Sequence, residues 1–192
     1  MSRVDLIVGP NGAGKSTFAQ EILGEVLPGI LFVNADLIAR QRWPEDPEGH
    51  SYEAARVAEA TRSALIESGN QFIAETVFSH PSKVALIDQA QEAGYFVALH
   101  VLMLPEHVAV ARVAARVDRG GHWVPENKIR ERYHRLWPLV AVAAAKAQSA
   151  AFWDNSTLEG PDLVAEMAGG QLLARPKWPS WTPDSLTGRW KA

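Results

Sequence analysis

Residues 4–17 read VDLIVGPNGAGKST, an apolar run that leads directly into a glycine-rich turn. Residues 9–16 match the pattern G-x-x-x-x-G-K-[S/T], the phosphate-binding loop, and the run 4–8 predicts the strand that should precede it. Glycines let backbone N–H groups turn inward around phosphate oxygens, and the helix expected from residue 15 adds a favourable dipole. A chance glycine-rich turn is the alternative, which the agreement of motif and context disfavours. The stretch therefore predicts a site for a nucleoside triphosphate.

The same loop predicts the nucleotide and metal contacts. Lys15 would reach the β- and γ-phosphates, and the Ser16 hydroxyl would ligate Mg²⁺. Phosphates and water can complete the coordination of this ion, so no cage of protein ligands is needed. We therefore expect ATP and Mg²⁺ as cofactors. The residues expected to contact the nucleotide are Gly9, Asn11, Gly12, Ala13, Gly14, Lys15, Ser16 and Thr17.

The composition limits the classes of protein that fit. A chain of 192 residues with 47% apolar residues suits one domain, with a core over 3–156 and a C-terminal hairpin and tryptophan-rich tail over 157–192. The net charge of −3 argues against a nucleic-acid or anionic-membrane binder. The absence of cysteine excludes disulfides, zinc fingers and thiol catalysis. With no signal-type segment or membrane span apparent, we expect a cytoplasmic protein.

Strand and helix patterns alternate along the chain. The expected strands are 4–8, 31–33, 71–74, 95–104 and 151–153. The expected helices are 15–23, 51–68, 81–94, one after Pro105 and one from Pro125. Pro138 should kink or split the last helix. The alternation predicts an α/β fold with a mostly parallel five-stranded sheet and helices on both faces.

The C-terminal segment departs from this alternation. Residues 163–174 predict a terminal hairpin, with a short helix from Pro161 as the alternative. The tail beyond carries Trp178, Trp181 and Trp190, separated by proline and serine. We favour an extended tail fixed to the body by its indole rings over an arm that binds a partner.

Two carboxylates close predicted strands. Asp36 follows the strand 31–33, and Glu75 and Thr76 end the strand 71–74, so all three lie at the sheet edge where α/β proteins bind ligands. Asp36 could be a general base on a substrate hydroxyl or an N-cap, and the phosphate-binding loop at the same edge favours the base. Glu75 and Thr76 could hold substrate or Mg²⁺-bound water, with a capping role as the alternative for Thr76.

Three arginines share one face of the helix after Pro105. Arg112, Arg116 and Arg119 are spaced i, i+4, i+7. Such a stripe is usually a solvated face, but arginine suits bidentate phosphate contacts and this stripe runs into a glycine pair typical of a lid. We favour Arg112 and Arg116 as catalytic residues and leave Arg119 open. His122, in the expected lid, is the one histidine that we assign to substrate.

Two other nucleotide-binding classes lack their motifs. A transporter-type ATPase needs a Ser-Gly-Gly-Gln signature and then a strand ending in Asp-Glu; residues 168–171 are a near match, but no such strand follows. A GTPase needs Asn-Lys-x-Asp, which is absent. A small kinase needs a base, a lid and mobile arginines, and this chain has candidates for all three.

Four blocks in order resemble the zeta-toxin family of P-loop kinases, in its short branch. They are residues 9–17, 34–38, 75–79 and 112–133, the last containing a Gly-Gly-His-x-Val-Pro step that is more specific than the loop. The resemblance covers about residues 3–156 and implies a P-loop kinase fold with a helical lid. Members of this family transfer the ATP γ-phosphate to the 3′-hydroxyl of UDP-N-acetylglucosamine, and a toxin implies an antitoxin partner.

The resemblance also implies roles for individual residues. Lys15 would grip the triphosphate, Asp36 would be the base on the sugar hydroxyl, and Glu75 would hold the nucleotide sugar. Arg112 would be a lid arginine, and Asn155 would border the adenine. His122 stands where larger toxins have a second lid arginine, so Arg116 or Arg119 would substitute. Val77 replaces a hydroxyl residue of the family.

The sequence thus predicts an ATP-dependent small-molecule kinase whose acceptor is best matched by UDP-N-acetylglucosamine. Another small alcohol or sugar as acceptor is one alternative. A non-enzymatic ATP-gated binding protein is the other. A kinase for nucleic-acid ends is disfavoured, because the chain shows no basic groove with interleaved aromatic residues.

Overall fold

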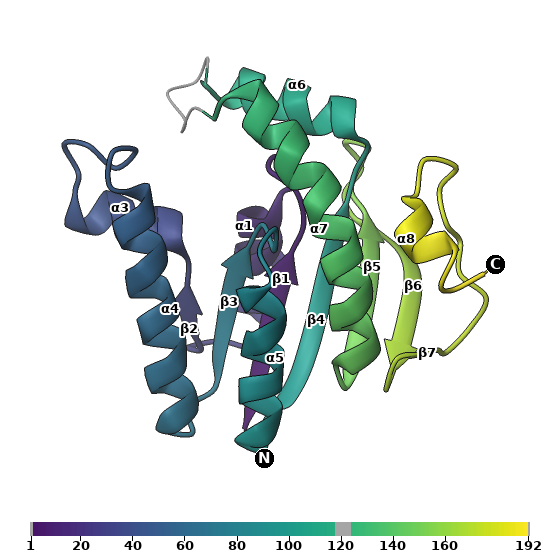
Figure 1. Cartoon of the computed structure of the whole chain (residues 1–192), viewed down its shortest axis with the longest axis horizontal. Coiled ribbons are helices and arrows are strands. Elements are labelled where there is room, and N and C mark those ends of the chain that lie inside the picture. The colour runs from purple at the N-terminus through teal and green to yellow at the C-terminus, as the bar shows by residue number, and fades with distance from the viewer. Residues whose placement is uncertain (1, 118–123, 192) are drawn as a thin grey trace.

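The computed structural model describes residues 2–117 and 124–191 and is built around one mixed sheet of seven strands (Figure 1). The strands are β1 (Arg3–Val8), β2 (Leu31–Val33), β3 (Phe72–Thr76), β4 (Phe96–Met103), β5 (Ser149–Asp154), β6 (Asp162–Ala168) and β7 (Gln171–Leu172). Their order in the sheet is β2-β3-β1-β4-β5-β6-β7. The first five are parallel, and β6 and β7 continue antiparallel.

The predicted α/β fold is confirmed, but the sheet has seven strands rather than five. The expected terminal hairpin forms as β6 and β7, and no helix starts at Pro161. β6 pairs with β5, so the hairpin belongs to the main sheet. The physical reason is that the outer edge of β5 would otherwise present unpaired N–H and C=O groups, and β6 satisfies them.

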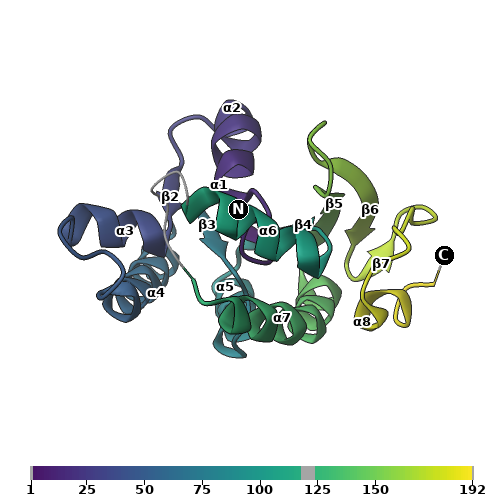
Figure 2. The same ribbon diagram turned by 90° about the horizontal axis from the view of Figure 1, so that it is seen from above.

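Helices cover both faces of the sheet, as predicted (Figure 2). They are α1 (Lys15–Phe18), the π-helical turn η1 (Ala19–Leu23), α2 (Gly24–Val26), α3 (Ala35–Arg42), α4 (Ser51–Glu67), α5 (Ser82–Glu92), α6 (Glu106–Val117), α7 (Glu126–Lys146) and α8 (Asp184–Thr187). α1 and α2 lie on one face, and α4, α5 and α7 lie on the other. Within the described ranges, no helix is long and apolar enough to cross a membrane.

The sheet order places the glycine-rich loop at a switch point. The chain runs from β1 outward to β2 and back to β3, and then starts again on the other side of β1 with β4. Ligands in open α/β sheets bind at such a point, outside the carboxyl ends of the strands. α6 and the first turns of α7 stand above this edge (Figure 1). The two helices expected to form the lid thus stand over this edge, and the connection between them lies outside the described residues.

Of the two outcomes expected at Pro138, a kink or a split of the last helix, the split is wrong. α7 continues through this residue from Glu126 to Lys146. A proline removes one helical hydrogen bond, here to the carbonyl of His134, and both Pro138 and His134 are exposed, where water can replace the lost donor. The neighbouring side chains Trp137 and Val140 are buried and hold the helix against the sheet.

The C-terminal tail packs on the hairpin through its indoles. The indole N–H of Trp178 donates to the carbonyl of Trp190 at 3.0 Å, and that of Trp190 donates to the carbonyl of Gly170 at 3.2 Å. Trp178 also meets the ring of Phe152 edge-on, with centroids 5.3 Å apart. These contacts fit a tail fixed to the body by its indole rings, but the tail is not extended throughout, because it contains the short helix α8 (Asp184–Thr187).

A buried ion cluster stabilises the start of the central strand. Asp5 on β1 is 2% exposed and accepts hydrogen bonds from Arg3 at 2.7 Å and from the His100 ring at 2.9 Å. Burial by itself would raise the pKa of Asp5, but the hydrogen bonds from His100 and Arg3 outweigh it, and the pKa is lowered. The charged carboxylate therefore stabilises the folded state.

We predict that Asp5→Asn lowers the free energy of unfolding at pH 7 by about 1–3 kcal/mol. Because the folded pKa is lowered, the contribution of Asp5 is present above its unfolded value near 3.8 and is lost as the pH falls through the folded pKa. Urea unfolding between pH 2 and 7 should show the two proteins converging at low pH. Asp88→Asn, which breaks an exposed pair with Lys146, should cost less than about 1 kcal/mol. An equal difference at every pH would contradict this account.

Candidate active site

The glycine-rich loop connects β1 to α1 and depends on two glycines. Gly12 and Gly14 have φ values of 76° and 79°, a left-handed backbone that residues with a Cβ rarely adopt. A Cβ on Gly14 would also lie 2.7 Å from the amide nitrogen of Asn155. That amide donates to the carbonyl of Ala13 at 2.9 Å, so the segment after β5 is bound to the loop.

Lys15 is a buried cation at the centre of this loop. Lys15 is only 6% exposed, and its side-chain ammonium donates to the carbonyl of Pro10 at 2.9 Å. A carboxylate oxygen of Glu75 lies 4.0 Å from the ammonium nitrogen. Burial lowers the pKa of Lys15, against the opposing influence of Glu75 and Asp36. The ammonium is thus desolvated without a close counter-ion, which suits it to an anionic ligand such as a phosphate.

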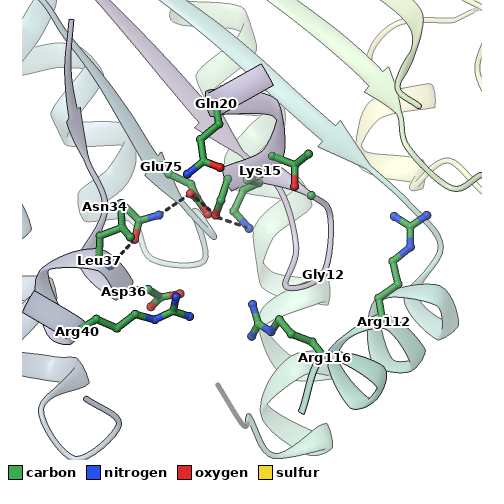
Figure 3. A pocket seen from close by; sticks show the side chains of 13 residues that line it. Gly12, Lys15, Gln20, Asn34, Asp36, Leu37, Arg40, Glu75, Arg112 and Arg116 are labelled. Atoms are coloured by element: carbon green, nitrogen blue, oxygen red, sulfur yellow. Dashed lines mark hydrogen bonds and ion pairs between the residues drawn. The ribbon is translucent and has the colours of Figure 1, made fainter. Parts of the chain in front are cut away.

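Glu75, at the end of β3, connects the loop to β2. Its Oε2 accepts from the Ser16 hydroxyl at 2.8 Å and also from the amide of Asn34 (Figure 3). The Ser16 hydroxyl and this carboxylate are hard oxygen ligands of the kind that Mg²⁺ prefers. In the part of the chain that the structure describes, no three His, Cys, Asp or Glu side chains form a metal cage. The donor set therefore fits a Mg²⁺ ion that completes its coordination with phosphates and water.

Asn34 takes the capping role that was one alternative for Asp36. Its side-chain oxygen accepts from the backbone N–H of Leu37 at 3.1 Å, at the start of α3. The N-cap interpretation of Asp36 is therefore wrong. Asp36 lies in the first turn of α3 and lines the same cavity as Lys15 and Glu75 (Figure 3). Asn34 was missed in the sequence, although an asparagine directly before a helical pattern is a strong capping signal.

Two adjoining cavities meet at this edge of the sheet. The first has a volume of about 410 Å³ and reaches Thr17, Arg40 and Arg112. The second has a volume of about 330 Å³ and extends between α4 and the start of α5, past Thr76. Residues that line both are Gly12, Lys15, Ser16, Asn34, Asp36, Glu75 and Arg116. The sequence-predicted residues Lys15, Asp36 and Glu75 are thus brought to a common boundary.

The two favoured arginines on α6 occupy different places. Arg112 lines the first cavity only, and its guanidinium donates to the carbonyls of Asn155 at 2.8 Å and Thr157 at 2.9 Å. Arg116, one turn further on, lines both cavities. The structure therefore separates the two residues that the sequence grouped together. Arg119 and His122 lie outside the described residues.

Thr76, Arg62 and Lys83 line the second cavity but not the first, as does Arg132 on α7. The Thr76 hydroxyl accepts from the backbone N–H of Phe78 at 3.2 Å, which is a local turn contact. Arg62 on α4 and Lys83 on α5 also line this cavity and were missed in the sequence. Arg62 occupies the buried stripe of α4 that includes Ala58 and Ile66. A cation in an apolar stripe at i, i+4 spacing was the signal that could have revealed it.

Solved structures with the same fold include a chain of the AvrRxo1-ORF1:AvrRxo1-ORF2 complex. With sulphate ions it superposes with a TM-score of 0.71 at 15% identity, covering 90% of this chain and 60% of that chain. With ATP the TM-score is 0.69 at 16% identity, with the same coverage. This protein thus spans about 60% of the length of the chains that it matches there.

Two further structures share the fold. A chain of the PezAT chromosomal toxin–antitoxin system of Streptococcus pneumoniae gives a TM-score of 0.61 at 13% identity, covering 86% of this chain and 72% of that chain. Shikimate kinase from Acinetobacter baumannii in complex with shikimate gives 0.52 at 22% identity, covering 74% and 81%. At these identities the likeness shows the fold alone, which is that of P-loop kinases.

The sequence also matches a relative and a family model. An uncharacterized protein of Haemophilus influenzae is 31% identical over 129 residues, which is 65% of this chain and 88% of that protein. The family model described as "AAA domain" (AAA_33) matches residues 4–139. Since that match includes the glycine-rich loop and most of the parallel sheet, the chain belongs to this AAA domain family of P-loop proteins.

Proposed function

We propose that the protein is an ATP-dependent phosphotransferase that moves the γ-phosphate of ATP to a hydroxyl of a small-molecule acceptor. The observation that carries this proposal is the boundary between the two cavities, where Lys15, Asp36 and Arg116 line both. An ATP hydrolase needs only a water molecule beside the γ-phosphate. A second cavity of about 330 Å³ instead offers room for an organic acceptor.

The first cavity is the nucleotide side in this proposal. Backbone N–H groups of residues 11–17 hold the phosphates, and Arg112 with the segment 155–157 closes this side. Because the guanidinium of Arg112 already donates to backbone carbonyls, we assign this residue to nucleotide binding. We assign Arg116 to stabilising the phosphoryl group during transfer. Ser16 and Glu75 would hold Mg²⁺, which neutralises phosphate charge when it is bound.

Phosphoryl transfer then takes place across the boundary. The acceptor hydroxyl oxygen bonds to the γ-phosphorus as the bond from that phosphorus to the β,γ-bridging oxygen breaks, and ADP leaves. The hydroxyl proton passes to the Asp36 carboxylate. Lys15 and Arg116 stabilise the negative charge of the phosphoryl oxygens during the transfer.

UDP-N-acetylglucosamine is the acceptor that we propose, from the resemblance to the zeta-toxin family. The fold shared with a chain of the PezAT toxin–antitoxin structure supports a kinase of this type; it does not identify the substrate. Glu75 contacts Ser16, so we assign Glu75 to metal binding. Thr76 lines the second cavity, so we assign it to binding of the sugar. His122 stays a prediction for acceptor binding. An antitoxin-type protein is the partner that we propose, in a cytoplasmic setting that supplies both ATP and the nucleotide sugar.

We predict that Lys15→Met abolishes the stabilisation of the protein by Mg²⁺-ATP. A ligand at one hundred times its Kd stabilises a protein by about 2.7 kcal/mol, and the variant should lose this shift in thermal unfolding. Without nucleotide the variant should be at least as stable as the original protein, because folding no longer desolvates an ammonium group whose pKa is lowered. Lys128→Met, at an exposed lysine, is the matched control. Unchanged ATP binding in Lys15→Met would refute the assignment.

We predict that Asp36→Asn lowers kcat for phosphotransfer by about 10²- to 10⁴-fold, the usual contribution of a general base. The affinity for ATP should change little, because Asp36 is not part of the loop. The measurement is ADP formation with Mg²⁺-ATP and UDP-N-acetylglucosamine, with mass spectrometry of the phosphorylated sugar and Asp88→Asn as control. Transfer that survives the Asp36 substitution would exclude it as the base. A lack of product with this sugar, with ATP still bound, would exclude the substrate.

A further inference from the structure

Arg62 on α4 and Lys83 on α5 are two cations that line a common cavity, and the exposed Glu59 lines an adjoining cavity together with both. Arg62 is 4% exposed, and its Nε has no hydrogen-bond partner. Among residues 2–117 and 124–191, no carboxylate forms an ion pair with either side chain. Buried cations are normally paired, so an unpaired one indicates that a ligand supplies the missing negative charge.

The electrostatics of the two side chains are unfavourable in the absence of a ligand. Burial lowers the pKa of Arg62, and the exposed Glu59 on the same helix opposes this only in part. Burial lowers the pKa of Lys83 as well, and the positive charge of Arg62 lowers it further, against the opposing charge of Glu59. The fold thus holds a buried guanidinium beside a half-buried ammonium of the same charge, an arrangement typical of binding sites rather than of structural cores.

The pair lies at the end of the second cavity away from the glycine-rich loop. Both side chains line this cavity together with Asp36 and Thr76. Both also line an adjoining cavity of about 270 Å³ that includes Ser63 and none of the loop residues. Lys83 lies in the first turn of α5, whose N-terminus adds partial positive charge. An acceptor with its hydroxyl at Asp36 would therefore extend toward these cations.

We propose that Arg62 and Lys83 form a subsite for an oxyanion group, a carboxylate or a phosphate, of the acceptor. The substrates of this protein are then alcohols that carry such a group at a distance from the reacting hydroxyl. The claim that the anion belongs to the acceptor rests on the proposed function, whereas the anion site itself rests on the cavity and on the unpaired cations.

A binding experiment tests the subsite without any turnover. The loop is first filled with Mg²⁺ and the non-hydrolysable analogue AMP-PNP, and inorganic phosphate or acetate is then added. The NMR signal of the Arg62 Nε–H group, assigned by its loss in Arg62→Gln, should shift and saturate with at least one of the two probes, which distinguishes phosphate from carboxylate. Lys83→Gln should weaken this binding at least tenfold, and Arg175→Gln, at an exposed tail residue, should leave it unchanged. A signal that ignores both probes would overturn the proposal.

A stability measurement separates a binding role from a structural one. Arg62→Met removes an unpaired buried charge and keeps much of the apolar volume, so its unfolding temperature without ligand should equal or exceed that of the original protein. It should also lose the response to the anion. A lowered unfolding temperature together with retained anion binding would show that Arg62 is structural.

A substrate comparison then tests the acceptor class. UDP-N-acetylglucosamine and N-acetylglucosamine share sugar hydroxyls but differ in phosphates, and gluconate and glucose differ in a carboxylate. Phosphotransfer should occur only with UDP-N-acetylglucosamine or gluconate, the anionic compounds of the two pairs. Arg62→Gln should raise the KM for the compound that reacts at least tenfold, with a smaller change in kcat. Equal transfer to the neutral members would overturn the subsite and leave the proposed function standing. Anion binding at Arg62 without transfer to any of the four would support the subsite and count against the proposed function.

Discussion

The burial of the Lys15 ammonium at the switch point of the sheet is the constraint on which the rest of the site depends. Desolvating a cation is costly, and here the carbonyl of Pro10, Glu75 at 4.0 Å and the charge of Asp36 offset it in part. The loop can hold the ammonium because Gly12 and Gly14 adopt left-handed conformations and because β1 lies between β3 and β4. An anionic ligand beside Lys15 removes the penalty, so the same interaction that weakens the empty fold favours binding of a phosphate.

A chain of polar contacts connects the ends of the parallel strands around this cation. Ser16 after β1 and Asn34 after β2 both donate to Glu75 on β3. On the other side, Asn155 after β5 donates to the loop carbonyl of Ala13, and Arg112 donates to the segment that follows. In the proposed function, these contacts would position the nucleotide, metal and acceptor sides along one edge of the sheet, which is the preorganisation that in-line transfer requires.

Local patterns predicted much of the fold and part of the site. The loop, the parallel strands and the strand-end carboxylates Asp36 and Glu75 follow from short-range spacing, and the structure brings Lys15, Asp36 and Glu75 together. The contacts between strands could not be predicted, because the bond from Asn34 to Glu75 joins residues that meet only when β2 and β3 pair. Arg62 leaves a trace in the sequence as a cation in the apolar stripe of α4, but its position beside Lys83 depends on the packing of α4 and α5. The extension of the sheet by β6 and β7 also depends on the open edge of β5, a tertiary property.

The central claim is that the γ-phosphate leaves ATP for a small organic molecule at the boundary of the two cavities. The most direct measurement follows the label from ATP carrying ³²P in the γ position, and separately in the α position, during incubation with the protein, Mg²⁺ and a protein-free bacterial metabolite extract. The account predicts that γ-label, and not α-label, appears in a small molecule other than inorganic phosphate, and that this product is absent with Asp36→Asn. Release of the γ-label only as inorganic phosphate, at the same rate in both proteins, would contradict the account and indicate an ATP hydrolase.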